Sequence, residues 1–298
     1  MTLILGMLLD ALLGEPKWLW SRIPHPAVIM GQLISWCDTR FNNGYNQRLK
    51  GALTILGCCT LAATLGWALQ QIPGQITDII ILAIMLAQKS LVQHVQAVGD
   101  SLRLSLGDGK RAVAMIVGRD TRDMNEPAVA RSAIESAAEN LSDGITAPIF
   151  WFAIGGLPGL LIYKITNTAD SMIGYRTPKH EKFGQAAARL DDVLNLIPAR
   201  LTALLIWAVT GRPSPGQIMQ EAPLHRSLNA GWPEAAMAYG LNIALSGPRS
   251  YDGEIRDYPY VNADGKHDLT ADQIDQSINV LWKTWGLLLG LAAIIAIL

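Results

Sequence analysis

The stretch GALTILGCCTLAATLGWALQQIPGQIT (51–77) contains no charged residue, and it decides the fold. About 20 apolar residues in an α-helix cross the roughly 30 Å hydrocarbon core of a bilayer. The stretch is long enough for one crossing, and Pro73-Gly74 marks a turn near its end. The sequence therefore predicts a membrane-spanning helix here.

The composition of the whole chain agrees with a membrane environment. Of the 298 residues, 50% are hydrophobic and only 16% are charged, whereas soluble domains carry about 25% charged residues. The formal net charge is -1, and no Lys/Arg run exceeds the pair Lys110-Arg111, so nothing points to a nucleic-acid partner. The three cysteines lack C-x-x-C spacing and are interpreted as small apolar residues.

Three further segments are predicted to lie in the membrane. Ile76–Val98 follows the first span after a short turn, so we expect these two helices to form an antiparallel hairpin. Leu201–Gly211 has only 11 residues and spans only if Ile197-Pro198-Ala199 and Arg200 extend it. Ile278–Leu298 is expected to be a C-terminal span.

The opening run MTLILGMLLDALLGEP (1–16) is also apolar, but Asp10 interrupts it. No basic region precedes its apolar core, as a secretory signal peptide would require. We therefore expect a retained helix rather than a cleaved signal.

The apolar segment Gly144–Tyr163 contains the cluster Gly155-Gly156-Leu157-Pro158-Gly159. Proline removes a backbone donor and glycine costs helix stability, so a continuous helix is not expected through this cluster. Broken backbone at membrane depth is tolerated only where protein or water satisfies its polar groups. The segment is therefore expected to be either a broken span or a re-entrant hairpin.

The distribution of basic residues gives a partial topology, because cytoplasmic loops are enriched in Lys and Arg. Asp38–Lys50 is basic while the Pro73-Gly74 turn is not, which places Asp38–Lys50 and Gly99–Asp143 in the cytosol. Lys164–Ile197 is basic too. A re-entrant Gly144–Tyr163 would keep both of its flanks cytosolic, and we prefer that arrangement to a simple span.

These patterns together predict an all-α, polytopic integral membrane protein with about five membrane segments, one of them broken or re-entrant. Polar helical and loop insertions separate the segments. We expect residues 1–298 to form a single membrane-embedded domain, with residues 212–275 as a soluble-facing polar insertion. In that insertion, Gly231-Trp232-Pro233-Glu234 is typical of a helix start, with Glu234 as a first-turn acid.

The first group of residues suited to chemistry lies in ARSAIESAAENLSDG. Arg131, Glu135, Glu139 and Asp143 follow one another at four-residue steps, so they are expected to share one helix face, with the helix ending at Asp143-Gly144. Neighbouring carboxylates suit Mg²⁺, which takes few protein ligands and completes its shell with substrate phosphates. The alternative is a solvated face on which Arg131 pairs with Glu135.

The second group lies in KITNTADSMIGYR. Asn167, Asp170 and Ser171 share a helix face, and the cations Lys164 and Arg176 flank them. An acid, amides and two cations suit a phosphorylated anionic substrate with a metal. The alternative is an ordinary polar helix end beside a span.

The third group lies in AAARLDDVLNLIPARLTA. Arg189, Asp191, Asp192, Asn195 and Arg200 are set into an otherwise apolar run. A charge at the bilayer centre costs about 2.5–3.5 kcal/mol or more, so such residues are expected to pair or to line a site. A buried Arg–Asp pair between helices and a functional site both explain this pattern.

Several nucleotide and hydrolase motifs are absent from the sequence. There is no GxxxxGK[ST], GxGxxG, HExxH or GxSxG, and Gly107-Asp108-Gly109-Lys110 lacks the first glycine and the Ser/Thr of a P-loop. Four of the five histidines, His94, His180, His225 and His267, also lack metal-binding spacing. Any nucleotide would be bound without a P-loop.

Taken as strings, these groups resemble the cobinamide-phosphate synthase family of cobalamin biosynthesis. The resemblance covers most of the chain in the right order. It is carried by LLDALLGEP…HP…MGQLI (8–34), VGRDT (117–121), AIESAAENLSDGITAPIFW (133–151), NTADSMIGYR (167–176), FGQAAARLDDVLNLIPARLTA (183–203) and NAGWPEAAMA (229–238). The tail after Ser250 fits least.

The resemblance implies an inner-membrane amide ligase with its active site facing the cytosol. Such an enzyme joins the free propionate of adenosylcobyric acid to (R)-1-aminopropan-2-ol phosphate, or a related amino-alcohol, with ATP and Mg²⁺. The product is adenosylcobinamide phosphate. The implied partners are the corrinoid, the amino-alcohol phosphate and membrane lipids, with a homo-oligomer or an association with other pathway enzymes as a further expectation.

With that chemistry in view, roles can be assigned by what each step needs: metal ligands, cations, a base and orienting groups. The expected metal ligands are Glu135, Glu139, Asp143 and Asp170. The expected catalytic residues are Lys164 and Arg189, which stabilise developing charge, and Asp191 or Asp192 as the base for the ammonium group. The expected substrate-binding residues are Asn140, Asn167, Ser171, Arg176, Asn195 and Arg200.

Two other classes of protein would share some of these features. A transporter also combines broken helices with charges inside the membrane, although the spans here are too few and too unequal for paired inverted repeats. A non-catalytic membrane subunit would tolerate amide substitutions of its carboxylates.

Overall fold

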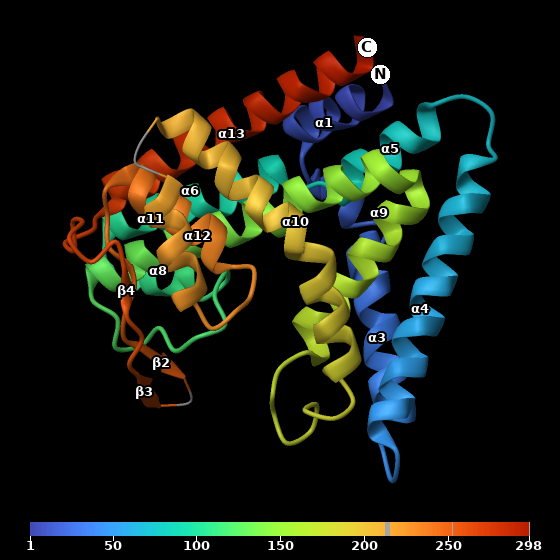
Figure 1. The fold of residues 1–298 in the computed structure, drawn as a ribbon, viewed down its shortest axis with the longest axis horizontal. Coiled ribbons are helices and arrows are strands. Elements are labelled where there is room, and N and C mark those ends of the chain that lie inside the picture. The colour runs from blue at the N-terminus through green and yellow to red at the C-terminus, as the bar shows by residue number, and fades with distance from the viewer. Residues whose placement is uncertain (212–214, 252, 298) are drawn as a thin grey trace. The chain divides into compact units, whose positions relative to one another are not determined.

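The computed structural model describes residues 1–211, 215–251 and 253–297, and most of them are helical (Figure 1). The helices are α1 (Thr2–Leu13), α2 (Lys17–Trp20), α3 (Pro26–Phe41), α4 (Gln47–Gln70), α5 (Ile76–Met85), α6 (Gln88–Leu104), α7 (Leu106–Val113), α8 (Glu126–Leu141), the π-helical turn η1 (Ser142–Thr146), α9 (Ala147–Ile173), α10 (Gln185–Thr210), α11 (Pro215–Glu221), the 3-10 turn η2 (Ala222–Leu224), α12 (Gly231–Leu241) and α13 (Ala271–Ile297). The strands are β1 (Leu245–Ser246), β2 (Arg249–Tyr251), β3 (Glu254–Arg256) and β4 (Tyr260–Val261).

Five helical runs are long and apolar enough to cross a membrane. They are Gln47–Gln70, Ile76–Leu104, Glu126–Ile173, Gln185–Thr210 and Ala271–Ala296. Large apolar side chains also remain outside the protein core, as on α4, where Leu53, Leu56 and Trp67 are each more than half exposed. The prediction of a polytopic helical membrane protein with about five segments is confirmed.

The chain forms two compact units. The first consists of Met1–Lys89 and Asp143–Leu196, and the second of Ser90–Ser142 and Ile197–Leu298. The expectation of a single domain over 1–298 stays a prediction.

In the first unit, α4 lies along α9, and α1 packs against α5 (Figure 1). The close approach of α4 to α9 depends on Gly66, because a Cβ there would overlap the backbone of Pro158. Small residues at helix contacts are the usual way in which membrane helices approach closely. The expected antiparallel hairpin of the first two spans is therefore wrong: α4 and α5 are joined by a short turn, but each packs mainly against a different helix.

The second predicted span is also interrupted. Helix α5 ends at Met85, Leu86 is extended, and α6 starts at Gln88. The amide of Gln88 donates to Asp10 Oδ2 at 2.9 Å, and both residues are buried. Because Asp10 satisfies an amide at the start of α6, the helix can restart inside an apolar segment.

Helix α9 is kinked where the glycine cluster predicted a break. Gly156 has φ 58° and ψ -148°, a conformation that only glycine adopts readily. A Cβ at Gly156 would also collide with the side-chain amide of Gln70. The break is confirmed, whereas the choice between a broken span and a re-entrant hairpin stays a prediction.

Three other helix boundaries differ from expectation or refine it. The helix expected to end at Asp143-Gly144 instead continues through η1 into α9. Helix α10 is continuous over 185–210, so the short apolar segment that starts at Leu201 is extended through Pro198 and Arg200, as its crossing required. Helix α13 starts at Ala271 rather than Ile278, while Leu298 lies outside the described residues.

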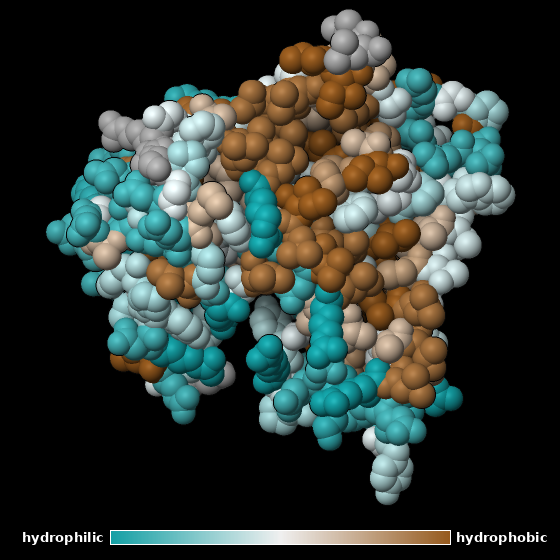
Figure 2. Space-filling model, in the orientation of Figure 1, coloured by the Kyte–Doolittle hydropathy of each residue, from teal (hydrophilic) through white to brown (hydrophobic). Residues whose placement is uncertain are grey.

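In the second unit, α8 packs against α13 and α12. The polar segment 212–275, whose first residue Arg212 lies outside the described residues, contains α11, η2, α12 and two antiparallel ladders, β1–β4 and β2–β3. Helix α12 starts at Gly231 as predicted. Figure 2 shows hydrophilic residues around β2 and β3, and apolar residues along the C-terminal end of α13.

Candidate active site

The first unit contains a buried polar network between α9 and α10. Asp191 accepts hydrogen bonds from Asn167 Nδ2 at 3.3 Å and from Asn195 Nδ2 at 3.0 Å. Asn195 Oδ1 in turn accepts from the hydroxyl of Tyr163 at 3.0 Å, and that hydroxyl is also 3.2 Å from the carbonyl oxygen of Asp143. The pairs Tyr163/Asn167 and Asp191/Asn195 are each four residues apart, so each pair lies on one helix face. The network fixes Asp191 inside an apolar segment.

Lys164 lies next to Tyr163 on α9 and is half-buried. The carboxylates of Asp143, Glu15 and Asp10 are within electrostatic range of its ammonium group. A cation in an apolar segment is stabilised by such neighbours. Lys164 therefore places an amino group near three carboxylates and next to Tyr163 of the buried network, as a site for an anionic substrate requires.

The remaining predicted residues of the first unit lie around the end of α9 and the start of α10. Asp170 and Ser171 are in the last turn of α9, and Asp170 is the less exposed of the two. Arg176 and Arg189 are exposed, and Asp192 is half-buried with Arg176 in electrostatic range. These groups present polar side chains beside the network.

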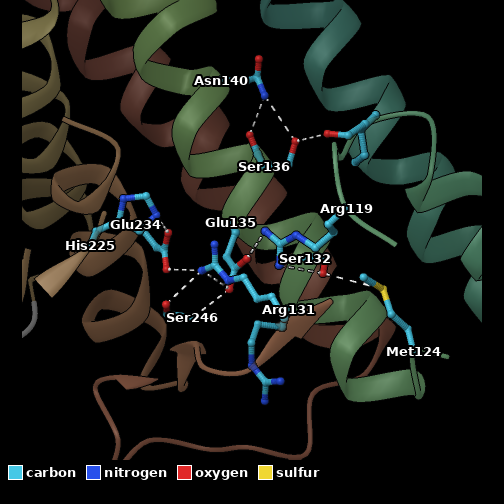
Figure 3. Close-up of polar contacts among 12 residues, drawn as sticks. Arg119, Met124, Arg131, Ser132, Glu135, Ser136, Asn140, His225, Glu234 and Ser246 are labelled. Atoms are coloured by element: carbon cyan, nitrogen blue, oxygen red, sulfur yellow. Dashed lines mark hydrogen bonds and ion pairs between the residues drawn. The ribbon is translucent and has the colours of Figure 1, made fainter. Parts of the chain in front are cut away.

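The second unit contains a different, buried charge cluster, formed by Arg119, Glu135, Arg249 and Glu234. Figure 3 labels Arg119, Glu135 and Glu234 of this cluster. Glu135 Oε2 accepts from Arg119 at 2.6 Å, and Glu135 Oε1 accepts from the amide of Ser246 at 2.7 Å and lies 3.3 Å from Arg249. The side chain of Glu135 is only 3% exposed. We call these four charged residues the Arg–Glu cluster.

Glu234 lies at the other end of the Arg–Glu cluster, 3.3 Å from Arg249 and 3.6 Å from His225 Nε2 (Figure 3). Burial, together with the nearby charge of Glu135, raises the pKa of Glu234 to about 8 despite Arg249. Burial and the charge of Arg249 lower the pKa of His225 to about 4. His225 Nδ1 accepts a hydrogen bond from the amide of Ser227. The proton of the neutral ring therefore lies on Nε2 and points to Glu234.

The contacts of Glu135 bear on two alternatives that the sequence left open. Arg131 does not pair with Glu135: it donates to the carbonyl oxygens of Ala244 and His267, so the interpretation as a solvated Arg131–Glu135 pair is wrong. Both carboxylate oxygens of Glu135 already accept hydrogen bonds, one from Arg119 and one from the amide of Ser246, which argues against a metal ion at this residue. Glu139 is exposed and stays a predicted ligand.

Two further predicted substrate-binding residues lie in the second unit. Arg200 donates to Asn229 Oδ1 at 3.2 Å and lies over the ring of Trp232, 4.6 Å from its centroid. Asn140 is exposed and donates to the carbonyl oxygen of Ser136 (Figure 3). Each residue is held in place by its own unit.

The four predicted metal ligands divide between the units, with Glu135 and Glu139 in the second and Asp143 and Asp170 in the first. Among the described residues, no group of three or more His, Cys, Asp or Glu side chains could hold a metal ion. Mg²⁺ needs only one or two carboxylates when phosphate oxygens and water complete its shell. Asp143, in η1, and Asp170, in the last turn of α9, stay predicted ligands.

The sequence did not single out several residues of these networks. Tyr163 looks like an apolar aromatic residue within a span, Arg119 lies within the VGRDT string, and Arg249 lies just before the tail that resembles the family least. Glu234 was expected to be a first-turn acid, which it is, but it is also buried and paired. Asn167, Asp191 and Asn195 of the first network were predicted site residues, and for Tyr163 the one signal is its four-residue spacing from Asn167.

Comparison with known proteins assigns the chain to a family. The CobD/Cbib protein family matches residues 3–281. "Cobalamin biosynthesis protein CobD" of Brucella anthropi is 46% identical over 97% of this chain and 94% of its own length. The proteins of the same name from Sinorhizobium fredii and Rhodobacter capsulatus are 43% and 42% identical, over 100% and 91% of this chain and 97% and 89% of their own lengths.

No solved structure is significantly similar to this chain. The family match nevertheless covers nearly all of it, and the identities above 40% extend over both units. The chain therefore belongs to the CobD/Cbib family, in which these relatives carry the name cobalamin biosynthesis protein CobD.

Proposed function

We propose that this chain acts in cobalamin biosynthesis as an ATP-dependent amide ligase of the bacterial inner membrane, with its active site facing the cytosol. It joins adenosylcobyric acid to (R)-1-aminopropan-2-ol phosphate, or a related amino-alcohol, and gives adenosylcobinamide phosphate. The family supports the pathway. The observation that carries the site is the network of Asp191, Asn195 and Tyr163 beside Lys164.

The reaction needs an activated carboxylate, because a carboxylate and an amine do not condense unaided in water. In the first step an oxygen of the propionate attacks the γ-phosphorus of ATP, and ADP leaves. In the second step the amine attacks the carbonyl carbon of the acyl phosphate, inorganic phosphate leaves, and the nitrogen loses a proton. The products are the amide, ADP and phosphate, so atoms and charges balance.

The positive side chains of the first unit suit the first step. Lys164 would bind the phosphoryl group and stabilise the charge that develops during its transfer, and Arg189 would contribute from the start of α10. Mg²⁺, held by Asp143 and Asp170 with phosphate oxygens, would neutralise phosphate charge when bound. A cation presented from a helix, as Lys164 is from α9, needs little reorganisation at the moment of reaction.

The second step needs a base that can reach the substrate. Asp192 is more exposed than Asp191, whose oxygens already accept hydrogen bonds from two amides. We therefore assign the proton of the ammonium group to Asp192. Asp191 orients Asn167, which would hold a substrate together with Ser171 and the phosphate-binding Arg176. Asn195 is buried, and its side-chain nitrogen and oxygen both bond within the network, so it orients Asp191 instead.

The test is a reconstitution of the purified protein in detergent or nanodiscs with both substrates, ATP and Mg²⁺. Equal amounts of amide, ADP and phosphate are expected, with the amide identified by mass. The Asp192→Asn enzyme should lose about 10²–10⁴-fold in kcat, the usual contribution of a general base. Asp100→Asn is the matched control, because Asp100 has an exposed side chain on α6 and belongs to none of the predicted site groups. Absence of amide from the wild-type protein would overturn the proposal.

One observation favours a transporter as the second candidate. The apolar segments break at Leu86 and at Gly156, and discontinuous membrane helices are typical of transport sites. Uptake of a labelled corrinoid into proteoliposomes, without ATP-linked amide formation, would favour that function over the ligase.

A further inference from the structure

The loop 174–184 between α9 and α10 is closed at its base. The amide of Gly184 donates to the carbonyl oxygen of His180 at 2.7 Å. A Cβ at Gly184 would overlap the carbonyl oxygen of Ile173, so the end of α9 and the start of α10 can approach only because this residue has no side chain. We call residues 174–184 the α9–α10 loop.

The α9–α10 loop is tied to α3 through a buried carboxylate. Asp38, whose side chain is 9% exposed, accepts from Lys179 Nζ at 2.6 Å and lies 3.3 Å from His180 Nε2, both through Oδ2. Its Oδ1 accepts from Asn42 Nδ2 at 2.8 Å. The same amide of Asn42 is 3.0 Å from the carbonyl oxygen of Lys179.

These contacts differ in how much they can contribute. The side chain of Lys179 is 65% exposed, and ion pairs of exposed lysines are weak. His180 is only 16% exposed, and Asn42 bonds both the carboxylate and the loop backbone. Gln47 Nε2 donates to Asn42 Oδ1 at 3.1 Å and so fixes the orientation of the amide. The loop is therefore held mainly by Asp38, Asn42 and His180.

The α9–α10 loop carries Arg176, which lies in electrostatic range of Asp192 on α10. We propose that Asp38 is a positioning residue: it holds the loop against α3 and thereby keeps Arg176 beside Asp192. A binding residue on a held loop loses less conformational freedom when the substrate arrives. This inference rests on the proposed function, in which Arg176 binds substrate phosphate and Asp192 takes the proton.

The experiment combines limited proteolysis with steady-state kinetics on the full-length protein in detergent. Trypsin cuts at Arg176, Lys179 and Lys182 in the loop are followed by mass spectrometry, and KM for the amino-alcohol phosphate and kcat are measured with the same samples. The variants are Asp38→Ala, Asp38→Glu and Asn42→Ala. Thr39→Ala is the matched control, because Thr39 bonds only Ser35 of its own helix.

We expect Asp38→Ala to raise the rate of loop cleavage about tenfold, since cleavage follows the population of the open loop when opening is fast. KM should rise by a similar factor while kcat changes little. Asp38→Glu should recover part of both effects, Asn42→Ala should show smaller effects in the same direction, and Thr39→Ala should show neither. If Asp38→Ala does not fold, Asp38→Glu and Asn42→Ala carry the test.

The outcomes separate this inference from the proposed function. A wild-type protein that forms no amide overturns the ligase, while loop cleavage still reports whether Asp38 holds the loop. If the wild type forms amide, unchanged cleavage in Asp38→Ala and Asn42→Ala overturns the positioning role. Faster cleavage with an unchanged KM overturns it too, because the loop would then be held without any effect on the substrate.

Discussion

Replacing Glu135 by alanine removes the one carboxylate that joins three donors of the Arg–Glu cluster. Arg119, Arg249 and the amide of Ser246 would lose their shared acceptor. Arg249 is 6% exposed and Arg119 12%, so water cannot easily replace the lost partner. Removing one partner of a buried ion pair costs about 3–5 kcal/mol, and we expect Glu135→Ala to lower the free energy of unfolding by that amount.

The natural control lies one helical turn away. Glu139 is exposed, and substitutions at such positions usually change stability by no more than about 0.5 kcal/mol. The assay is denaturant unfolding in detergent micelles, followed by tryptophan fluorescence, for Glu135→Ala and Glu139→Ala. The double variant Glu135→Ala/Arg249→Met should be less destabilised than the sum of its single variants, because one uncompensated charge is removed.

Equal stability of the Glu135→Ala and Glu139→Ala proteins would refute this reasoning. It would mean that the buried arginines find other partners or water, and that the Arg–Glu cluster contributes nothing to the fold. Strict additivity in the double variant would equally contradict a direct interaction between Glu135 and Arg249.

Three further predictions concern single substitutions at Gly156, Glu234 and Asp38. Gly156→Ala should destabilise the protein by about 1–3 kcal/mol in the same unfolding assay, because Gly156 has a positive φ and a Cβ would meet Gln70. The folded state favours the protonated form of Glu234, whose pKa is raised from its ordinary value of 4.5 to about 8. The stability that this group contributes is complete below pH 4.5 and is lost as pH rises to about 8. Glu234→Gln should therefore flatten the fall of Tm between those pH values. Burial alone would raise the pKa of Asp38, but the hydrogen bonds from Lys179, Asn42 and His180 outweigh burial and lower that pKa. Its stabilisation is thus present at neutral pH and lost on acidification through that lowered pKa, and Asp38→Asn should weaken the acid dependence of Tm.

The sequence predicted the spans well because hydrophobic length is a local property. It also predicted the break at Gly156, since glycine and proline act on their own backbone. It missed the interruption at Leu86, because neither glycine nor proline lies near the junction of α5 and α6. There the start of α6 is satisfied by Asp10, which is 78 residues away in the chain.

The candidate site was predictable to a different degree in each group. Three- and four-residue spacing predicted that Asn167, Asp170 and Ser171 share a helix face, and all three lie on α9. The same spacing suggested that Glu135 belongs with Arg131, and this was wrong. A helix face says which residues can be neighbours, but the partner of a buried charge is chosen by tertiary packing over long sequence separations.

Residues of the segment 246–253 contact the Arg–Glu cluster and the VGRDT string, although no string that carries the family resemblance includes them. Ser246, Arg249 and Ser250 follow the last of the strings that carry the resemblance, and Gly253 lies in the tail after Ser250, which fits the family least. Arg249 and Ser246 bind Glu135, while Ser250 Oγ and the amide of Gly253 bond to Asp120 in the VGRDT string. Two of the strings that carry the resemblance are thus bonded by residues that belong to none of those strings. Because backbone amides supply two of these bonds, the segment can perform this role with many different side chains, and sequence patterns alone are a poor guide to its importance.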